Sequence, residues 1–169
     1  VFSTAMSQSL IPALSQLRSI DDHERLNNLY SFAIRLHILW LVPALLFLAL
    51  IARPFFTIWA GDEFGRDCEI PFYFLLIGAG FNIVAYVPGA TIIAFGRTDV
   101  LAKLYWLELS CYIPIVWLLT AEFGTHGAAV AWSLRAIVDV IVLLELARRI
   151  AGVQRFGQSS DRIWNERRC

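Results

Sequence analysis

Charge is scarce in this sequence, and lysine is almost absent from it. Charged side chains make up 17% of the 169 residues, and only one of the 14 cationic residues, Lys103, is a lysine. Soluble domains usually carry about 25% charged residues. The low charge, combined with 58% hydrophobic residues and a mean hydropathy of +0.62, excludes a disordered chain and argues against a soluble globular enzyme.

Cysteine is also scarce, and there is no net charge. The three cysteines, Cys68, Cys111 and Cys169, lie far apart without metal-site spacing, and their odd number argues against a disulfide framework. The 14 basic and 14 acidic residues cancel, so no overall field attracts a nucleic acid. The sequence has no glycine-rich phosphate loop, nucleophile elbow or zinc spacing. We therefore expect no catalytic centre, metal, cofactor or nucleic-acid partner.

Long uncharged runs dominate the sequence instead. Residues 36–52 carry no formal charge, and residues 70–96 carry none over 27 positions. A helix needs about 20 mostly apolar residues to cross a bilayer, whereas the strands of a membrane barrel alternate over about ten. The sequence therefore predicts an all-α, integral membrane helical bundle. We expect four transmembrane helices, at about 28–52, 71–95, 101–120 and 126–148.

Proline and short polar stretches divide these runs. Pro43, Pro88 and Pro114 each interrupt an expected span. In a membrane bundle, neighbouring groups can satisfy the carbonyls that proline frees, so we expect kinks rather than helix ends. The expected connections between spans are the polar or aromatic stretches 53–69, 96–99 and 122–127.

The two ends of the chain differ from its middle. Residues 1–17 are amphipathic and rich in Ser and Gln, and we expect them to be the end of a preceding membrane helix. Because the sequence starts at Val1, we interpret it as a fragment of a longer chain. Residues 18–150 would then form the four-helix membrane region, and residues 151–169 a basic cytoplasmic tail.

The cations are distributed unevenly between the two expected sides of the membrane. Ten of them lie in segments 18–25, 97–103 and 148–168, whereas the opposite side holds only Arg53 and Arg66. Positively charged loops are retained in the cytoplasm. The sequence therefore predicts a multi-pass membrane protein with a cytoplasmic C-terminus.

Charged side chains inside the expected spans are candidates for a substrate or ion pathway. Arg135 and Asp139 would bracket the midplane and, being four residues apart, can pair with each other. Charges at membrane depth are costly and usually face a bundle interior or a water-filled path. A self-neutralised pair that only aids packing is an equally good interpretation. Glu108 would lie roughly 7 Å deep, and an interface residue that extends to the headgroups is favoured over a cavity lining.

Asn82 is the fourth candidate and belongs to a stripe of small residues. Gly78, Asn82, Ala85 and Gly89 recur on one face of the second expected span. Small residues let helices approach closely, and an asparagine can form a hydrogen bond across the contact. Packing is the favoured role of this stripe, and substrate contact is the alternative.

Several short motifs, in their order and spacing, resemble those of a known family. They are PALS at 12–15, LNNLY at 26–30, IWAG at 58–61 with Phe64, AFGR at 94–97, FG at 123–124, GAA at 127–129, Trp132, Arg135 and Asp139. With these motifs the chain resembles the C-terminal part of a polysaccharide-transporter flippase of the O-antigen type, within the MATE-like superfamily.

The resemblance implies an alternating-access carrier of the bacterial inner membrane whose two halves enclose a cationic cavity. The chain would be a fragment of this larger two-halved transporter. Its substrate would be a lipid-linked oligosaccharide, and its partners the lipid bilayer and the N-terminal half of the same transporter. Arg135 would receive the pyrophosphate, and Asp139 would orient it or take part in ion coupling. The alternatives are a multidrug or peptidoglycan-precursor carrier of the same superfamily, or a membrane scaffold whose buried charges only fix helix pairing.

Overall fold

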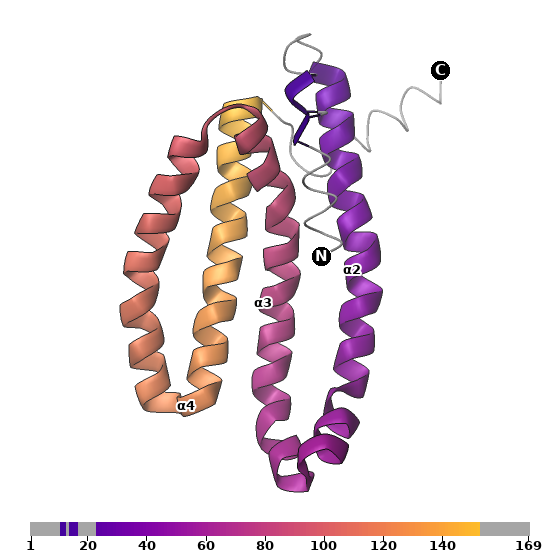
Figure 1. Ribbon diagram of the computed structural model, residues 1–169, viewed down its shortest axis with the longest axis vertical. Coiled ribbons are helices and arrows are strands. Elements are labelled where there is room, and N and C mark those ends of the chain that lie inside the picture. Colours follow the sequence, from indigo (N-terminus) through magenta and orange to yellow (C-terminus); the bar gives the residue numbers. More distant parts are fainter. Residues whose placement is uncertain (1–10, 13, 17–22, 153–169) are drawn as a thin grey trace, which may run out of the picture.

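The computed structural model describes residues 11–12, 14–16 and 23–152, and all regular elements within them are α-helical. Residues 11–12 and 14–16 are helical. The long helices are α2 (His23–Ala60), α3 (Asp62–Ala94) and α4 (Thr98–Ala151). Figure 1 shows them as long rods that run alongside one another. The predicted all-α class is confirmed.

Each of the three long helices could cross a membrane. The candidate spans are Arg25–Ala60, Asp62–Ala94 and Thr98–Ala151. Much of their outer surface is apolar and open, as at Leu50, which is 79% exposed, and Ile58, which is 87% exposed. Such a surface suits lipid rather than water. The chain is therefore a multi-pass membrane protein.

The described residues contain three candidate spans where four, with the end of a fifth, are expected. The difference lies in α4, which covers the expected spans 101–120 and 126–148 in one run of helix. The predicted end of a preceding helix at 1–17 and the predicted tail at 151–169 fall largely outside the described residues. The predicted domain limits therefore stay predictions.

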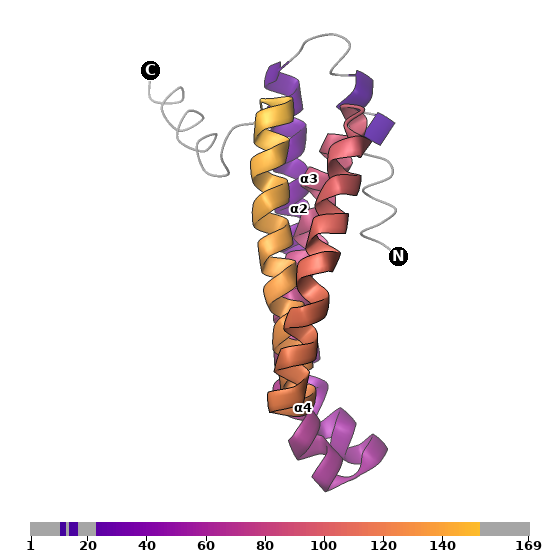
Figure 2. The ribbon, with the colours of Figure 1, turned by 90° about the vertical axis from the view of Figure 1, so that its left-hand side faces the viewer.

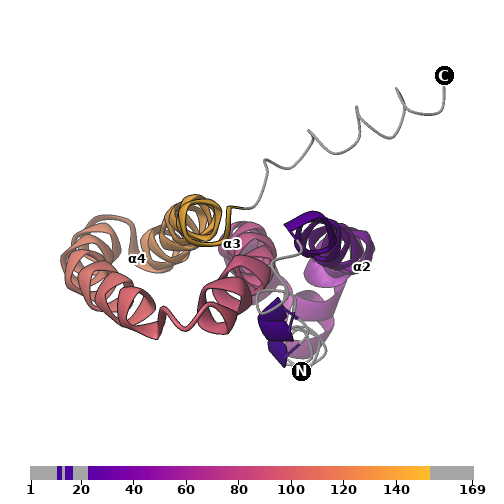
Figure 3. The same cartoon turned by 90° about the horizontal axis from the view of Figure 1, so that it is seen from above.

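α4 reverses its direction at Gly124. This residue has φ 58° and ψ −133°, a backbone conformation that is open to glycine and rarely adopted by residues with a side chain. The two arms of α4, residues 98–123 and 125–151, lie side by side in Figures 1 and 3. At 1.5 Å per residue each arm is about 40 Å long, which exceeds the roughly 30 Å hydrocarbon core of a bilayer.

The helices also extend further than expected around Gly61. Residues 53–69, expected as a connection, are helical except for Gly61, which has φ 95° and separates α2 from α3. Figure 2 shows this stretch bending outward at the lower end of the bundle. Its rings pack across the turn, since Phe56 contacts Phe64 and Phe72 edge-on at centroid distances of 6.1 and 5.2 Å. Aromatic packing thus orders a segment whose composition alone indicates a loop.

The positions of the prolines and of the turn between α3 and α4 agree more closely with the sequence-based predictions. Pro43, Pro88 and Pro114 all lie inside helices and none ends one. A short turn at residues 95–97 joins α3 to α4, close to the predicted connection at 96–99. In the view from above, the helices form a curved row in which α3 lies between α2 and α4 (Figure 3). α3 packs against both neighbours.

At Gly78, α3 approaches the second arm of α4 so closely that a side chain would not fit. A Cβ atom added there would lie 2.7 Å from Cζ3 of Trp132 and 2.8 Å from Cα of Ser133. The Ser133 hydroxyl donates a hydrogen bond to the Phe74 carbonyl of α3 at the same level. Ala85 lies in a buried cluster with α4 residues that include Val140 and Leu143. The predicted packing role of the small-residue stripe is therefore confirmed at Gly78 and Ala85.

Gly78→Ala should lower the free energy of unfolding by about 1–3 kcal/mol, because the backbone of Ser133 limits how far α4 can yield. The measurement is the thermal unfolding midpoint of the detergent-solubilised protein. Gly89→Ala is the matched control, since an added Cβ there meets no atom within 4 Å. Equal midpoints for the two variants would contradict this packing.

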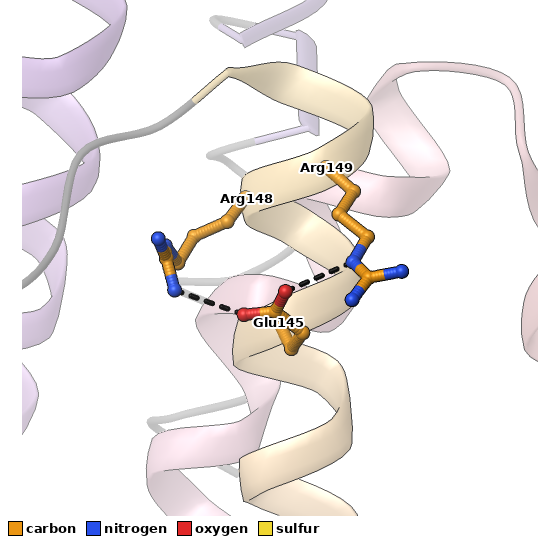
Figure 4. A network of polar contacts seen from close by, with 3 residues as sticks. All are labelled: Glu145, Arg148 and Arg149. Atoms are coloured by element: carbon orange, nitrogen blue, oxygen red, sulfur yellow. Dashed lines mark hydrogen bonds and ion pairs between the residues drawn. The ribbon is translucent and has the colours of Figure 1, made fainter.

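One end of the row gathers most of the described cations. The start of α2, the turn between α3 and α4 and the end of α4 lie at this end (Figure 1), which places Arg25, Arg97, Lys103, Arg148 and Arg149 there. Figure 4 shows Glu145 between Arg148 and Arg149, at 2.9 Å from each, so part of this positive charge is locally compensated. The opposite end of the row, at the turn between α2 and α3, holds Arg53 and Arg66. The described helices thus have one end with more cations than the other, as the sequence predicts.

Candidate functional site

A cleft of about 650 Å³ lies between the second half of α3 and the two arms of α4. Three of the four candidate residues line it: Asn82 from α3, and Arg135 and Asp139 from the second arm of α4. The rings of Tyr86 and Tyr105 line it as well. The helix packing therefore brings residues that are more than 50 positions apart in the sequence to one cleft.

The fourth candidate, Glu108, reaches the cleft residues through an ion pair. Nε of Arg135 lies 2.9 Å from Oε1 of Glu108, and the two side chains are only 28% and 12% exposed. The guanidinium carbon also lies 5.8 Å from the ring centroid of Tyr112, a cation–π distance. Glu108 and Tyr112 both belong to the first arm of α4, so that arm fixes Arg135 at two contacts.

This ion pair corrects two expectations. Among the described residues, Arg135 forms its ion pair with Glu108 and not with Asp139. Glu108 does not extend toward the headgroups, because its side chain is 12% exposed and held by Arg135. The physical reason is the reversal at Gly124, which places the first arm of α4 beside the second. Spacing along one helix cannot reveal a contact between two arms.

Asp139 is left with unmet bonding capacity. The residue is 5% exposed, and its Oδ1 atom has no hydrogen-bond partner within the part of the chain that the structure describes. It lies within electrostatic range of both Glu108 and Arg135. Leaving a buried acceptor unsatisfied costs roughly 1–3 kcal/mol. Such a group in a native fold calls for an explanation, and a ligand donor is one.

The four residues of the small-residue stripe lie in two different environments. Gly78 and Ala85 pack against α4, whereas Asn82 and Gly89 line the cleft. Asn82 is half-buried there and presents an amide that can both donate and accept hydrogen bonds. A contact between Asn82 and substrate stays a prediction.

Two features of the site were not foreseen from the sequence. Tyr86 lies one helical turn from Asn82 and lines the same cleft, a position that its spacing could have indicated. The Glu108–Arg135 pair had a weaker signal in the sequence, namely opposite charges in successive spans joined by a short connection.

Within residues 11–12, 14–16 and 23–152, no group of three His, Cys, Asp or Glu side chains could hold a metal ion.

Comparison with known proteins finds relatives among membrane carriers. Over 156 residues the chain is 28% identical to the "Putative O-antigen transporter" of Shigella flexneri, which covers 90% of this chain and 36% of that protein. Over 145 residues it is 26% identical to the "Probable low-salt glycan biosynthesis flippase Agl15" of Haloferax volcanii, which covers 84% of this chain and 30% of that protein. The chain resembles polysaccharide flippases.

A third relative is also named as a membrane protein. The chain is 27% identical over 143 residues to the "Uncharacterized membrane protein in cps region" of Klebsiella pneumoniae, covering 83% of this chain and 28% of that protein. The chain thus spans about a third of the length of these curated relatives, between 28% and 36%. No family model matches the sequence, and no solved structure does.

Proposed function

We propose that this chain is part of a membrane carrier that flips or exports lipid-linked polysaccharide precursors by alternating access. The observation that carries the proposal is the cluster of Arg135, Glu108 and Asp139 beside a cleft deep within apolar helices. Charged groups at such a depth usually line a transport path. The similarity to proteins named as an O-antigen transporter and a glycan flippase supports the substrate class.

The carrier requires more than the described helices. These form an open curved row (Figure 3), and transporter sites form where two repeats face each other. The chain spans about a third of its relatives, so we propose that the N-terminal half of the same carrier covers the open face. The two arms of α4 would then be two of four spans, and residues 1–17 would end a fifth.

The orientation is proposed from the charges. The end of α4 would face the cytoplasm of a bacterial inner membrane, since the described cations gather at that end (Figure 1). Arg135 lies near the middle of the second arm of α4, residues 125–151. From Gly124, Arg135 is 11 residues away, or about 16 Å along the helix axis.

The roles of the four candidate residues follow from their contacts. Arg135 would be the central cation of the path, and Glu108 would hold its guanidinium in place. Asp139 and Asn82 would face the substrate from α4 and α3. None of these roles needs a catalytic step, in keeping with carriers rather than enzymes among the relatives.

The test is deletion of the gene that encodes this chain in its native host. We expect loss of a surface polysaccharide and accumulation of its lipid-linked precursor on the cytoplasmic side, both reversed by a plasmid copy. Normal display together with raised drug sensitivity would favour a multidrug carrier instead. Normal display and unchanged drug sensitivity would favour a scaffold.

A further inference from the structure

The charged cluster beside the cleft has no net positive charge. It contains one guanidinium, from Arg135, and two carboxyl groups, from Glu108 and Asp139. With Asp139 ionised, the cluster has one negative charge in excess, and with Asp139 protonated it is neutral. Among the residues that the structure describes, the other titratable side chains lining the cleft are Tyr86 and Tyr105, and they add no positive charge. Neither state of the cluster attracts a phosphate group.

The Glu108 carboxylate already neutralises the charge of the Arg135 guanidinium that a phosphate would need. The two groups are 2.9 Å apart, and the Glu108 side chain is 12% exposed. A phosphate that displaced it would leave a buried carboxylate without its cation. Separating such a pair is strongly unfavourable in a region of low dielectric constant. The ion pair therefore opposes phosphate binding here.

The hydrogen-bonding groups of the cleft instead match a ligand with many hydroxyl groups. Oδ1 of Asp139 is a buried acceptor without a donor among the described residues. The amide of Asn82 can donate and accept, and the terminal nitrogens of Arg135 carry N–H donors beyond the Nε that meets Glu108. Tyr86 and Tyr105, 40% and 46% exposed, add aromatic surface to the same cleft.

We propose that this cleft binds an uncharged sugar ring, with Asp139 accepting hydrogen bonds from its hydroxyl groups. Asn82 and Arg135 complete the polar contacts, and the two tyrosine rings face the C–H surface of the sugar. The volume of about 650 Å³ lies within the range of small-molecule sites. The inference rests on the proposed carrier function, and adds that Asp139 selects the sugar while the phosphate binds elsewhere in the carrier.

The test measures binding to the complete carrier that contains this chain, reconstituted in lipid nanodiscs. The probes are farnesyl pyrophosphate and the same lipid bearing one glucose, galactose or N-acetylglucosamine residue. We expect at least one sugar-bearing probe to bind about tenfold more tightly than the bare lipid, the effect of a single good hydrogen bond to a charged group. Asp139→Asn should reduce that preference to about twofold or less and leave the bare lipid's affinity unchanged.

Asp99→Asn is the matched control, because Asp99 is on the surface, with a 57% exposed side chain in an ion pair with Arg97. It should keep the full sugar preference. Equal affinities for the bare and all sugar-bearing probes would overturn the sugar site while leaving the carrier function standing. A loss of affinity for both kinds of probe in Asp139→Asn would overturn it too. Failure of every probe to bind would refute the carrier function itself.

Discussion

Arg135→Ala should reduce surface polysaccharide display to the level of the gene deletion. The substitution leaves Glu108 and Asp139 in a half-buried cluster without a cation. Removing one member of a buried ion pair costs about 3–5 kcal/mol, because the remaining charge is uncompensated. Display of glycan on intact cells, measured against the amount of protein in the membrane, reports the effect. Arg149→Ala, a 75% exposed arginine of the same arm, is the control and should display normally.

A second variant separates transport from folding. Arg135→Leu combined with Glu108→Leu removes both charges of the pair, so it should restore the amount of membrane protein that Arg135→Ala loses. Replacing a buried ion pair by apolar residues is often neutral or stabilising. Display should nevertheless stay absent, because the guanidinium that lines the cleft is gone. Normal display by this double variant would show that the arginine has only a structural role.

The charge exchange Arg135→Glu with Glu108→Arg tests the scaffold alternative on the same pair. A purely structural ion pair tolerates the exchange, since both arms of α4 still carry opposite charges. We expect this variant to restore the amount of membrane protein that Arg135→Ala loses. Display should stay absent, because a glutamate at position 135 and Asp139 would put two carboxyl groups on one arm of α4. The structure directs this exchange to Glu108, the actual partner of Arg135.

The all-helical class followed directly from composition, whereas the extent of the helices did not. Uncharged runs at 36–52 and 70–96 are too long for strands, and both lie inside helices. Hydropathy could not foresee that residues 53–69 are helical, because their order depends on rings such as Phe56 and Phe72 meeting across the Gly61 turn. Where these helices begin and end therefore depends on contacts between residues that are distant in the sequence.

The candidate site, too, can be predicted from the sequence only in part. Arg135, Asp139 and Asn82 could be chosen from the sequence because polar groups are rare inside apolar helices, and the structure places them around one cleft. The pairing of Arg135 could not be chosen correctly. Asp139 was the local candidate at four residues' distance, but the reversal at Gly124 supplies Glu108 from the other arm.

Gly127→Ala should destabilise the protein more than any other glycine-to-alanine change in the described helices. A Cβ atom at this position would overlap the carbonyl oxygen and carbon of Leu119, which belong to the backbone of the facing arm. A backbone obstacle cannot rotate away as a side chain can. We expect a cost of about 3 kcal/mol or more, the upper part of the range for overpacking.

The same substitution should also abolish glycan display, because the arms that Gly127 lets approach are the arms that Glu108 and Arg135 connect. Thermal unfolding in detergent gives the stability, and cell-surface labelling gives the display. Gly80→Ala is the matched control: its added Cβ would meet only Cδ1 of Leu45, at 3.0 Å, the end of a flexible side chain. Gly80→Ala should therefore stay near the unmodified protein in both measurements. Equal behaviour of the two variants would mean that the arms of α4 are not in contact at Gly127, and the ion pair would lose its structural basis.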